Sequence, residues 1–276
     1  MAINLASKYS SKVDERFTRR SFTQSGINRE YEWSGVATIH VYSIPTVPMN
    51  DYTRSGLSRY GTPTELQDTK QDLTLTKDRA FTFTIDKGNA EEQVGVKESG
   101  KALSRQINEV VIPEVDKYRL SVMAAAAVAA GGASSVEVID ATNAYKALLL
   151  AGEYMSDYNV PLLKRVAYVT NSYYSFLKLD NSFIKASEMG QKMLVTGQVG
   201  EVDGVAIVPI PASYLPANTD FILAHPAATV AADKLTEYKT HDNPPGINGK
   251  LVEGRVIYDA FVLENKKRAL YVHKNA

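Results

Sequence analysis

Two stretches of the chain alternate apolar and polar residues with a period of two, the pattern of half-buried β-strands. They cover residues 36–43 and 72–86, and the 45–70 segment between them is rich in Pro, Gly, Asp, Thr and Arg. The pattern predicts a long two-stranded hairpin over residues 31–92 with a polar tip. A hairpin of this kind has too little core to be stable alone. We therefore expect something to pack against it, and a neighbouring subunit is the obvious candidate.

The strongest helical pattern runs from about residue 97 to residue 130. Its apolar residues recur at steps of three and four, namely Leu103, Ile107, Val110, Val111, Val115, Tyr118 and Val122. Pro113 lies inside this stretch, where it removes a backbone hydrogen bond and is expected to bend the helix. Gly131 and Gly132 are expected to end it.

A mixed region follows over residues 136–223. Asp140 is expected to cap a helix that runs through Tyr154, and residues 172–177 are expected to form a second helix. Apolar, β-branched runs predict strands at 165–169, at 205–208 (ended by Pro209 and Pro211), at 255–263 and at 268–273. Helices and strands do not alternate as regular βαβ units, which favours an α+β fold over a doubly wound sheet.

The first 30 residues are polar and basic. Six basic residues stand against three acidic ones, and the basic ones are Lys8, Lys12, Arg16, Arg19, Arg20 and Arg29. The segment has too few large apolar residues to build a core. It is therefore interpreted as an arm that becomes ordered on another surface. The alternative is a solvated, frayed terminus.

Composition indicates an ordinary folded protein. Of the 276 residues, 44% are hydrophobic and 22% charged, and the 31 basic residues balance the 31 acidic ones, so no net field draws the chain to nucleic acid or membrane. The absence of cysteine excludes disulfides and thiolate sites and is consistent with a reducing cytoplasm. The start lacks the apolar core of a signal peptide, and the most apolar run, 122–130, is too short to span a membrane.

Motifs of catalysis are missing. The chain has no phosphate-binding or dinucleotide-binding glycine loop and no nucleophile elbow. His241-Asp242 could form half of a metal or acid–base site, but its Asn-Pro-Pro-Gly surroundings favour a turn. Adjacent Glu91 and Glu92 would project differently and do not suit a catalytic pair. Sixteen tyrosines against one tryptophan favour protein–protein contacts. We expect no catalytic residue, no cofactor and no metal site.

Several segments in series resemble the major capsid proteins of tailed bacteriophages with the HK97 fold, in versions from phages of Firmicutes. Three of them are Pro48-Met49-Asn50-Asp51-Tyr52-x-Arg54, residues 77–86 (KDRAFTFTID) and residues 111–119 (VIPEVDKYR). Two more are Gly197-x-Val199-Gly200-x-Val202-x-Gly204-x-x-Ile207 and residues 254–262 (GRVIYDAFV). The resemblance covers residues 30–273.

The resemblance implies a layout for the whole chain. Residues 1–30 would be the N-terminal arm, and 31–92 an extended β-hairpin called the E-loop. Residues 93–135 and 224–276 would form the peripheral (P) domain with its long spine helix, and 136–223 the axial (A) domain. Some relatives carry a scaffolding segment ahead of the arm, whereas this chain begins almost at the arm. Scaffolding would then be a separate protein, or the segment would have been removed and the numbering would start at the mature product; Met1 favours a separate protein.

The function implied is that of a structural shell protein rather than an enzyme. Its copies would form hexamers and pentamers that close into an icosahedral head around double-stranded DNA, contacted without sequence specificity. The resemblance further implies separate scaffolding and portal proteins, no membrane, a place in the virion capsid, and assembly in the host bacterial cytoplasm. The alternatives are an encapsulin, a nanocompartment shell of the same fold, and an enzyme whose site is not recognised.

Three groups of residues are candidates for these roles. The arm residues Lys8, Lys12, Arg16, Arg19 and Arg20 are expected on the inner face of the shell or at contacts between capsomers. Pro113, Glu114, Asp116 and Arg119 are expected to bend and brace the spine helix, with Asp116 and Arg119 three residues apart and able to pair. Asp51, Tyr52 and Arg54 are expected to make contacts at the E-loop tip.

Some members of the family join an E-loop lysine to an asparagine of another subunit. The lysines available for this are Lys70 and Lys77, and the asparagines are Asn243 and Asn248. Both lysines lie among charged residues without an obvious apolar pocket, so we expect no cross-link.

Overall fold

A computed structural model describes residues 21–31, 33, 38–88, 99–134, 137–180 and 200–275. The first half of this part contains η1 (Thr23–Gly26), β1 (Thr38–Ser43), β2 (Thr69–Thr74), β3 (Lys77–Asp86), α2 (Ser99–Gln106), the π-helical turn η2 (Ile107–Val111), α3 (Ile112–Ala129) and α4 (Ala144–Asp157). The second half contains β4 (Arg165–Thr170), α5 (Asn171–Leu179), β5 (Glu201–Val202), β6 (Val205–Ile210), η3 (Ala212–Tyr214), β7 (Thr219–Ala224), β8 (Thr229–Asp242), β9 (Gly249–Val262), η4 (Glu264–Ala269) and β10 (Leu270–Lys274).

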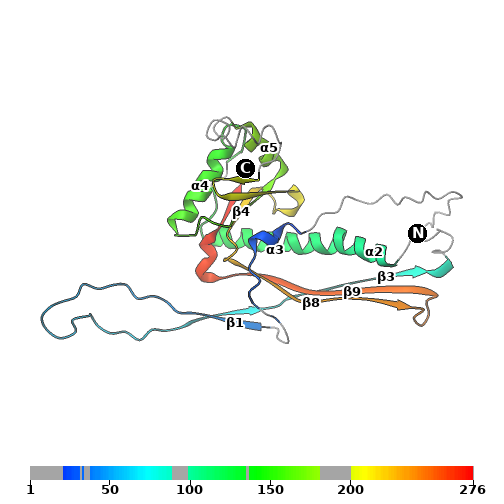
Figure 1. Cartoon of the computed structure of the whole chain (residues 1–276), viewed down its shortest axis with the longest axis horizontal. Helices are drawn as coiled ribbons and strands as arrows, with labels where there is room; N and C mark the ends of the chain where they lie inside the picture. Colours follow the sequence, from blue (N-terminus) through cyan, green and yellow to red (C-terminus); the bar gives the residue numbers. More distant parts are fainter. Residues whose placement is uncertain are drawn as a thin grey trace.

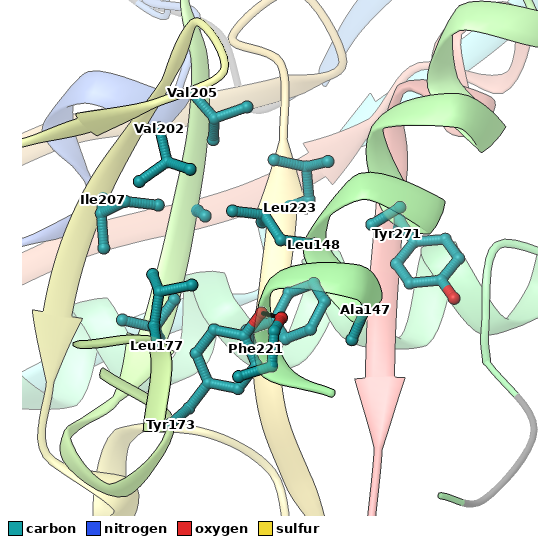
Figure 2. Packing of buried hydrophobic residues seen from close by; sticks show 14 of the residues in the cluster. Ala147, Leu148, Tyr173, Leu177, Val202, Val205, Ile207, Phe221, Leu223 and Tyr271 are labelled. Carbon is teal, nitrogen blue, oxygen red and sulfur yellow. Dashed lines mark hydrogen bonds between the residues drawn. The ribbon is translucent and has the colours of Figure 1, made fainter. Parts of the chain in front are cut away.

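The main core lies on both faces of a five-stranded sheet with the order β10-β7-β4-β6-β5. Along β7, Phe221 and Leu223 face the core shared with α4 and α5, while Ile222 and Ala224 face the core shared with α3. Figure 2 shows the first of these cores, with Leu148 of α4 over the sheet. Because both faces are covered, the last four residues of β7, 221–224, form an apolar run without alternation. This strand is not among those expected from the sequence.

The long helix consists of α2, η2 and α3 in series (Figure 1). At the π-helical turn, the Ile112 N–H donates to the carbonyl of Ile107, five residues back, immediately before Pro113. The wider turn stands where the proline, which has no N–H, would otherwise interrupt α-helical bonding. The helix ends as expected: Gly131 has a φ of 75°, and the Gly132 N–H donates to the Ala127 carbonyl at 2.8 Å.

The expected hairpin is shorter than predicted. Among the described residues, β1 pairs antiparallel with β2, and β3 leaves to pair with β9 in a three-stranded sheet of order β3-β9-β8. The predicted strand over 72–86 is therefore two strands, which separate at Leu75 and Thr76. The hairpin and the three-stranded sheet extend in opposite directions from this point (Figure 1).

Two local predictions differ from the structure. Asn143, not Asp140, is the N-cap of α4, and the Tyr145 N–H is capped by the buried carboxylate of Asp180 at 2.9 Å. Pro209 lies within β6 rather than ending it. The Ile207 N–H donates to Gly200, away from β4, so the Pro209 nitrogen two residues on faces the same side, where β5 pairs with Val205 and Ala206 alone among the described residues. The last strand, β10, pairs with β7 in the five-stranded sheet.

Candidate functional site

The hairpin tip, residues 44–68, is a long loop with apolar side chains in solvent. Met49 and Leu57 are 99% and 98% exposed, and Ile44, Val47, Tyr60 and Leu66 are also exposed. The loop is closed near its end by the Thr53 N–H, which donates to the Arg59 carbonyl at 3.1 Å. Apolar side chains in such numbers on one exposed loop are what a surface that packs against a partner would present.

The predicted tip residues lie in this loop. Tyr52 packs edge-to-face on Tyr60 with 5.0 Å between ring centroids, so it closes the loop from within and still exposes about half of its surface. Asp51 and Arg54 are both exposed. The arm residues Lys8, Lys12, Arg16, Arg19 and Arg20 lie outside the described residues.

The spine helix α3 holds the segment around η1 through Asp116. The Asp116 side chain is fully buried, and its carboxylate accepts hydrogen bonds from the Ser21 hydroxyl (2.7 Å), the Phe22 N–H (2.8 Å) and the Thr23 hydroxyl (2.7 Å). Three donors satisfy a charge that is removed from water, which is what a buried carboxylate requires. The carboxylate therefore joins the spine helix to the N-terminal segment.

Arg119 extends this cluster to β8. Its Nη2 donates to both carboxylate oxygens of Asp233 at 2.9 and 3.0 Å, and its Nη1 donates to the Thr23 hydroxyl at 3.4 Å. Asp116 and Arg119 lie on one face, but they do not pair with each other as predicted. Each has its own partner, and the Thr23 hydroxyl bridges them. Ser21, Thr23 and Asp233 had no distinguishing pattern in the sequence.

Glu114 and Pro113 occupy the first turn of α3. Glu114 accepts a hydrogen bond from Arg79 of β3 at 2.8 Å and one from the Tyr258 hydroxyl of β9 at 3.1 Å. Burial and the neighbouring Glu114 carboxylate raise the pKa of Tyr258, so the phenol stays protonated and donates. Glu114 thus contacts the three-stranded sheet, directly after the π-helical turn and Pro113.

His241 and Asp242, the candidate half of a metal or acid–base site, each contact a different charged residue. His241 pairs with Glu253 at 3.2 Å, and Asp242 pairs with Lys250 at 3.6 Å. Across the described part of the chain, no group of three or more His, Asp or Glu side chains could hold a metal ion. None of the described helices is both long and apolar enough to cross a bilayer. Glu91 and Glu92 lie outside the described residues.

The two candidate cross-linking lysines, Lys70 of β2 and Lys77 of β3, each contact a partner side chain. The Lys70 ammonium lies 3.2 Å from the Asp72 carboxylate, and the Lys77 ammonium lies 5.0 Å from the centre of the Tyr118 ring. A neutral amine is needed for attack on an asparagine amide. We therefore expect any assembled form, boiled in detergent, to run as one band near the 30.3 kDa monomer. A ladder of heavier bands would contradict this, and loss of the ladder in Lys70→Arg or Lys77→Arg would then identify the reacting lysine.

Comparison with protein-family models gives no match, and neither does comparison with curated protein sequences. Solved structures match over nearly the whole chain. A structure from Mycobacterium phage Che8 has a TM-score of 0.75 at 18% identity and covers 99% of this chain and 98% of its own. The capsid of cyanophage P-SCSP1u has a TM-score of 0.74 at 14% identity, with coverages of 99% and 93%.

The mature capsid of bacteriophage PhiM1 has a TM-score of 0.70 at 13% identity, with coverages of 98% and 92%. The α+β fold of phage capsid structures, expected from the sequence, is therefore confirmed for this chain. The closer likeness to versions from phages of Firmicutes stays a prediction.

Proposed function

We propose that this chain is a major capsid protein, a structural protein whose copies form hexamers and pentamers and close into an icosahedral phage head around double-stranded DNA. The observation that carries the proposal is the match, over 98–99% of the chain, to structures that include two phage capsids. At these identities the match shows the fold, and the surface of the subunit supplies the independent support.

The hairpin tip is that support. Its exposed apolar residues have no core of their own, and an extended loop of 25 residues is unusual in a compact domain unless it has a function. In a closed shell every subunit has a neighbour at the same place, so each tip meets a partner surface. We propose that these contacts are made by Asp51, Tyr52 and Arg54. We also propose that the spine helix is bent and braced by Pro113, Glu114, Asp116 and Arg119.

The proposed layout follows from this role. Residues 1–30 are the arm, 31–92 the E-loop, 93–135 with 224–276 the P domain, and 136–223 the A domain, to which β10 contributes a strand. We propose separate scaffolding and portal proteins, assembly in the host bacterial cytoplasm and residence in the virion capsid.

Negative-stain electron microscopy of the purified protein tests the proposal. Closed icosahedral particles that retain double-stranded DNA, when the protein is isolated from infected cells, are the expected result. Closed particles that hold a cargo protein and no nucleic acid would favour the encapsulin alternative. Small oligomers under all assembly conditions, together with a measurable turnover, would favour an enzyme and contradict the proposal.

The basic arm gives a separate prediction. We propose that Lys8, Lys12, Arg16, Arg19 and Arg20 lie where packaged phosphates concentrate negative charge. Replacing Arg16, Arg19 and Arg20 by glutamate is expected to impair assembly or to lower DNA retention, measured as nucleic acid per particle.

A charge-matched control separates this effect from net charge. Lys87, Lys146 and Lys164 are exposed outside the arm, and glutamate at these three positions changes the net charge equally. The control is expected to retain more DNA than the arm variant. Filled heads of normal yield from the arm variant would contradict the prediction.

A further inference from the structure

The root of the hairpin is attached to β9 by a buried carboxylate. Asp259 is 1% exposed, and its Oδ2 accepts hydrogen bonds from the N–H (2.8 Å) and the hydroxyl (2.9 Å) of Thr76. Thr76 stands between the end of β2 and the start of β3, where the chain leaves the hairpin for the three-stranded sheet. Asp259 therefore binds the chain at the point where it passes from one sheet to the other.

A second attachment lies further out along β2. The Gln71 side chain donates to the Val262 carbonyl at 3.0 Å and accepts from the Glu264 N–H at 3.1 Å. The Gln71 amide therefore bonds to the adjacent backbone of the same chain as a strand would, just past the end of β9. Beyond it, the Asn265 amide donates to the Ser43 hydroxyl at the end of β1.

Apolar packing fills the space between these polar attachments. Leu73 of β2 is 1% exposed and belongs to a small core with Trp33, Val230 and Leu263. Trp33, which precedes β1 in the chain, stacks on Phe261 with 5.5 Å between ring centroids. The hydrogen bonds named here therefore join the hairpin and its root to one segment, residues 259–265. The apolar core beside them contains Leu263 of the same segment.

The same stretch is bound to the spine helix. The Tyr118 hydroxyl of α3 donates to Oδ1 of Asp259 at 2.7 Å, and the Tyr118 ring packs edge-to-face on Tyr258. Burial and the Asp259 carboxylate raise the pKa of Tyr118 to about 12, so the phenol remains a donor at all ordinary pH values. Asp259 therefore has one oxygen bound to the hairpin root and the other bound to the helix.

We propose that residues 259–265 are a rigid mount that joins β1 and β2 to the spine helix, so that hairpin and helix move as one body and the hairpin direction is set within the single subunit. The tip is not part of this body, because the hydrogen bonds and the ring contact found for residues 44–68 in the described part of the chain, such as Thr53 with Arg59 and Tyr52 with Tyr60, join tip residues only to one another. The inference concerns the subunit alone and stands whether or not the subunit builds a shell.

The natural absence of cysteine allows direct spin labelling. One pair of labels, Tyr42→Cys on β1 and Ala125→Cys on α3, reports hairpin against helix. A second pair, Tyr42→Cys and Thr84→Cys on β3, reports hairpin against sheet. All three positions are exposed or half-exposed, and distance distributions are measured on unassembled subunits.

The unaltered mount is expected to give narrow distributions for both pairs. Gln71→Ala is expected to widen both about twofold, because the outer attachment is lost. Tyr118→Phe keeps the ring and removes only the bond to Asp259, so it is expected to widen the hairpin–helix distribution and not the hairpin–sheet one. Gln67→Ala, at an exposed glutamine of the tip just before β2, is the matched control and is expected to change neither.

Broad distributions with the unaltered mount would overturn the proposal. So would a Tyr118→Phe variant whose hairpin–helix distribution is unchanged, since Asp259 would then not couple the two. Particle formation is a separate measurement, so failure of the mount and failure of the capsid proposal are distinguishable.

Discussion

Replacing Asp116 by alanine is expected to lower the free energy of unfolding by about 3–5 kcal/mol, the size of effect seen when one partner of a buried charged cluster is removed. The change leaves the Ser21 hydroxyl, the Phe22 N–H and the Thr23 hydroxyl without their acceptor. It also removes negative charge beside the Arg119 guanidinium, which is 3% exposed. Urea unfolding of the subunit, followed by circular dichroism, measures the loss.

Asp157→Ala is the matched control, because Asp157 is an exposed acidic residue in the last turn of another helix. It is expected to change the free energy of unfolding by less than about 0.5 kcal/mol. Limited proteolysis adds a local readout: in Asp116→Ala, trypsin is expected to cleave faster at Arg29. A loss below about 1 kcal/mol in Asp116→Ala would show that water or other donors replace the cluster.

Removing the hairpin tip is expected to abolish shell formation and leave the subunit folded. Residues 44–68 can be replaced by Asn-Gly, because Ser43 and Thr69 are paired and a two-residue turn closes an antiparallel hairpin. The tip adds nothing to the three buried cores of the described residues. The free energy of unfolding is therefore expected to stay within about 1 kcal/mol of the full chain.

Sedimentation of the assembly mixture measures particles, and urea unfolding of the same preparation measures the fold. Hydrogen exchange on unassembled subunits completes the test, since a tip without a core is expected to show little protection there. Leu57→Ser alone, at a residue 98% exposed, is expected to lower particle yield without changing unfolding. Normal particles from the shortened chain would contradict the assembly role of the tip.

The sequence predicted best where the cause of structure is local. The spine helix is evident from its apolar stripe, and its end from Gly131 and Gly132, because spacing and turn conformation act within a few residues. The 45–70 tip was evident for the same reason. The strand β8 was missed, because charged and polar residues fill its outer half as they would fill a loop.

The prediction was wrong about which strands pair with each other. The run over 72–86 has the alternation of a strand throughout, yet its halves join different sheets, because β9 competes with β1 for the second half. Alternation reports which residues share a face and not which strand lies alongside.

The sequence by itself determined the fold class, the helical spine and an exposed hairpin tip without a core, since each follows from residue pattern over short spans. Only the tertiary structure decided the contacts that position these parts. Asp116 meets Ser21 across 95 residues, Tyr118 meets Asp259 across 141, and Gln71 meets Val262 across 191. A lone Asp, Tyr or Gln has no distinguishing pattern in sequence, and its role arises when folding removes water and leaves one partner within hydrogen-bonding distance.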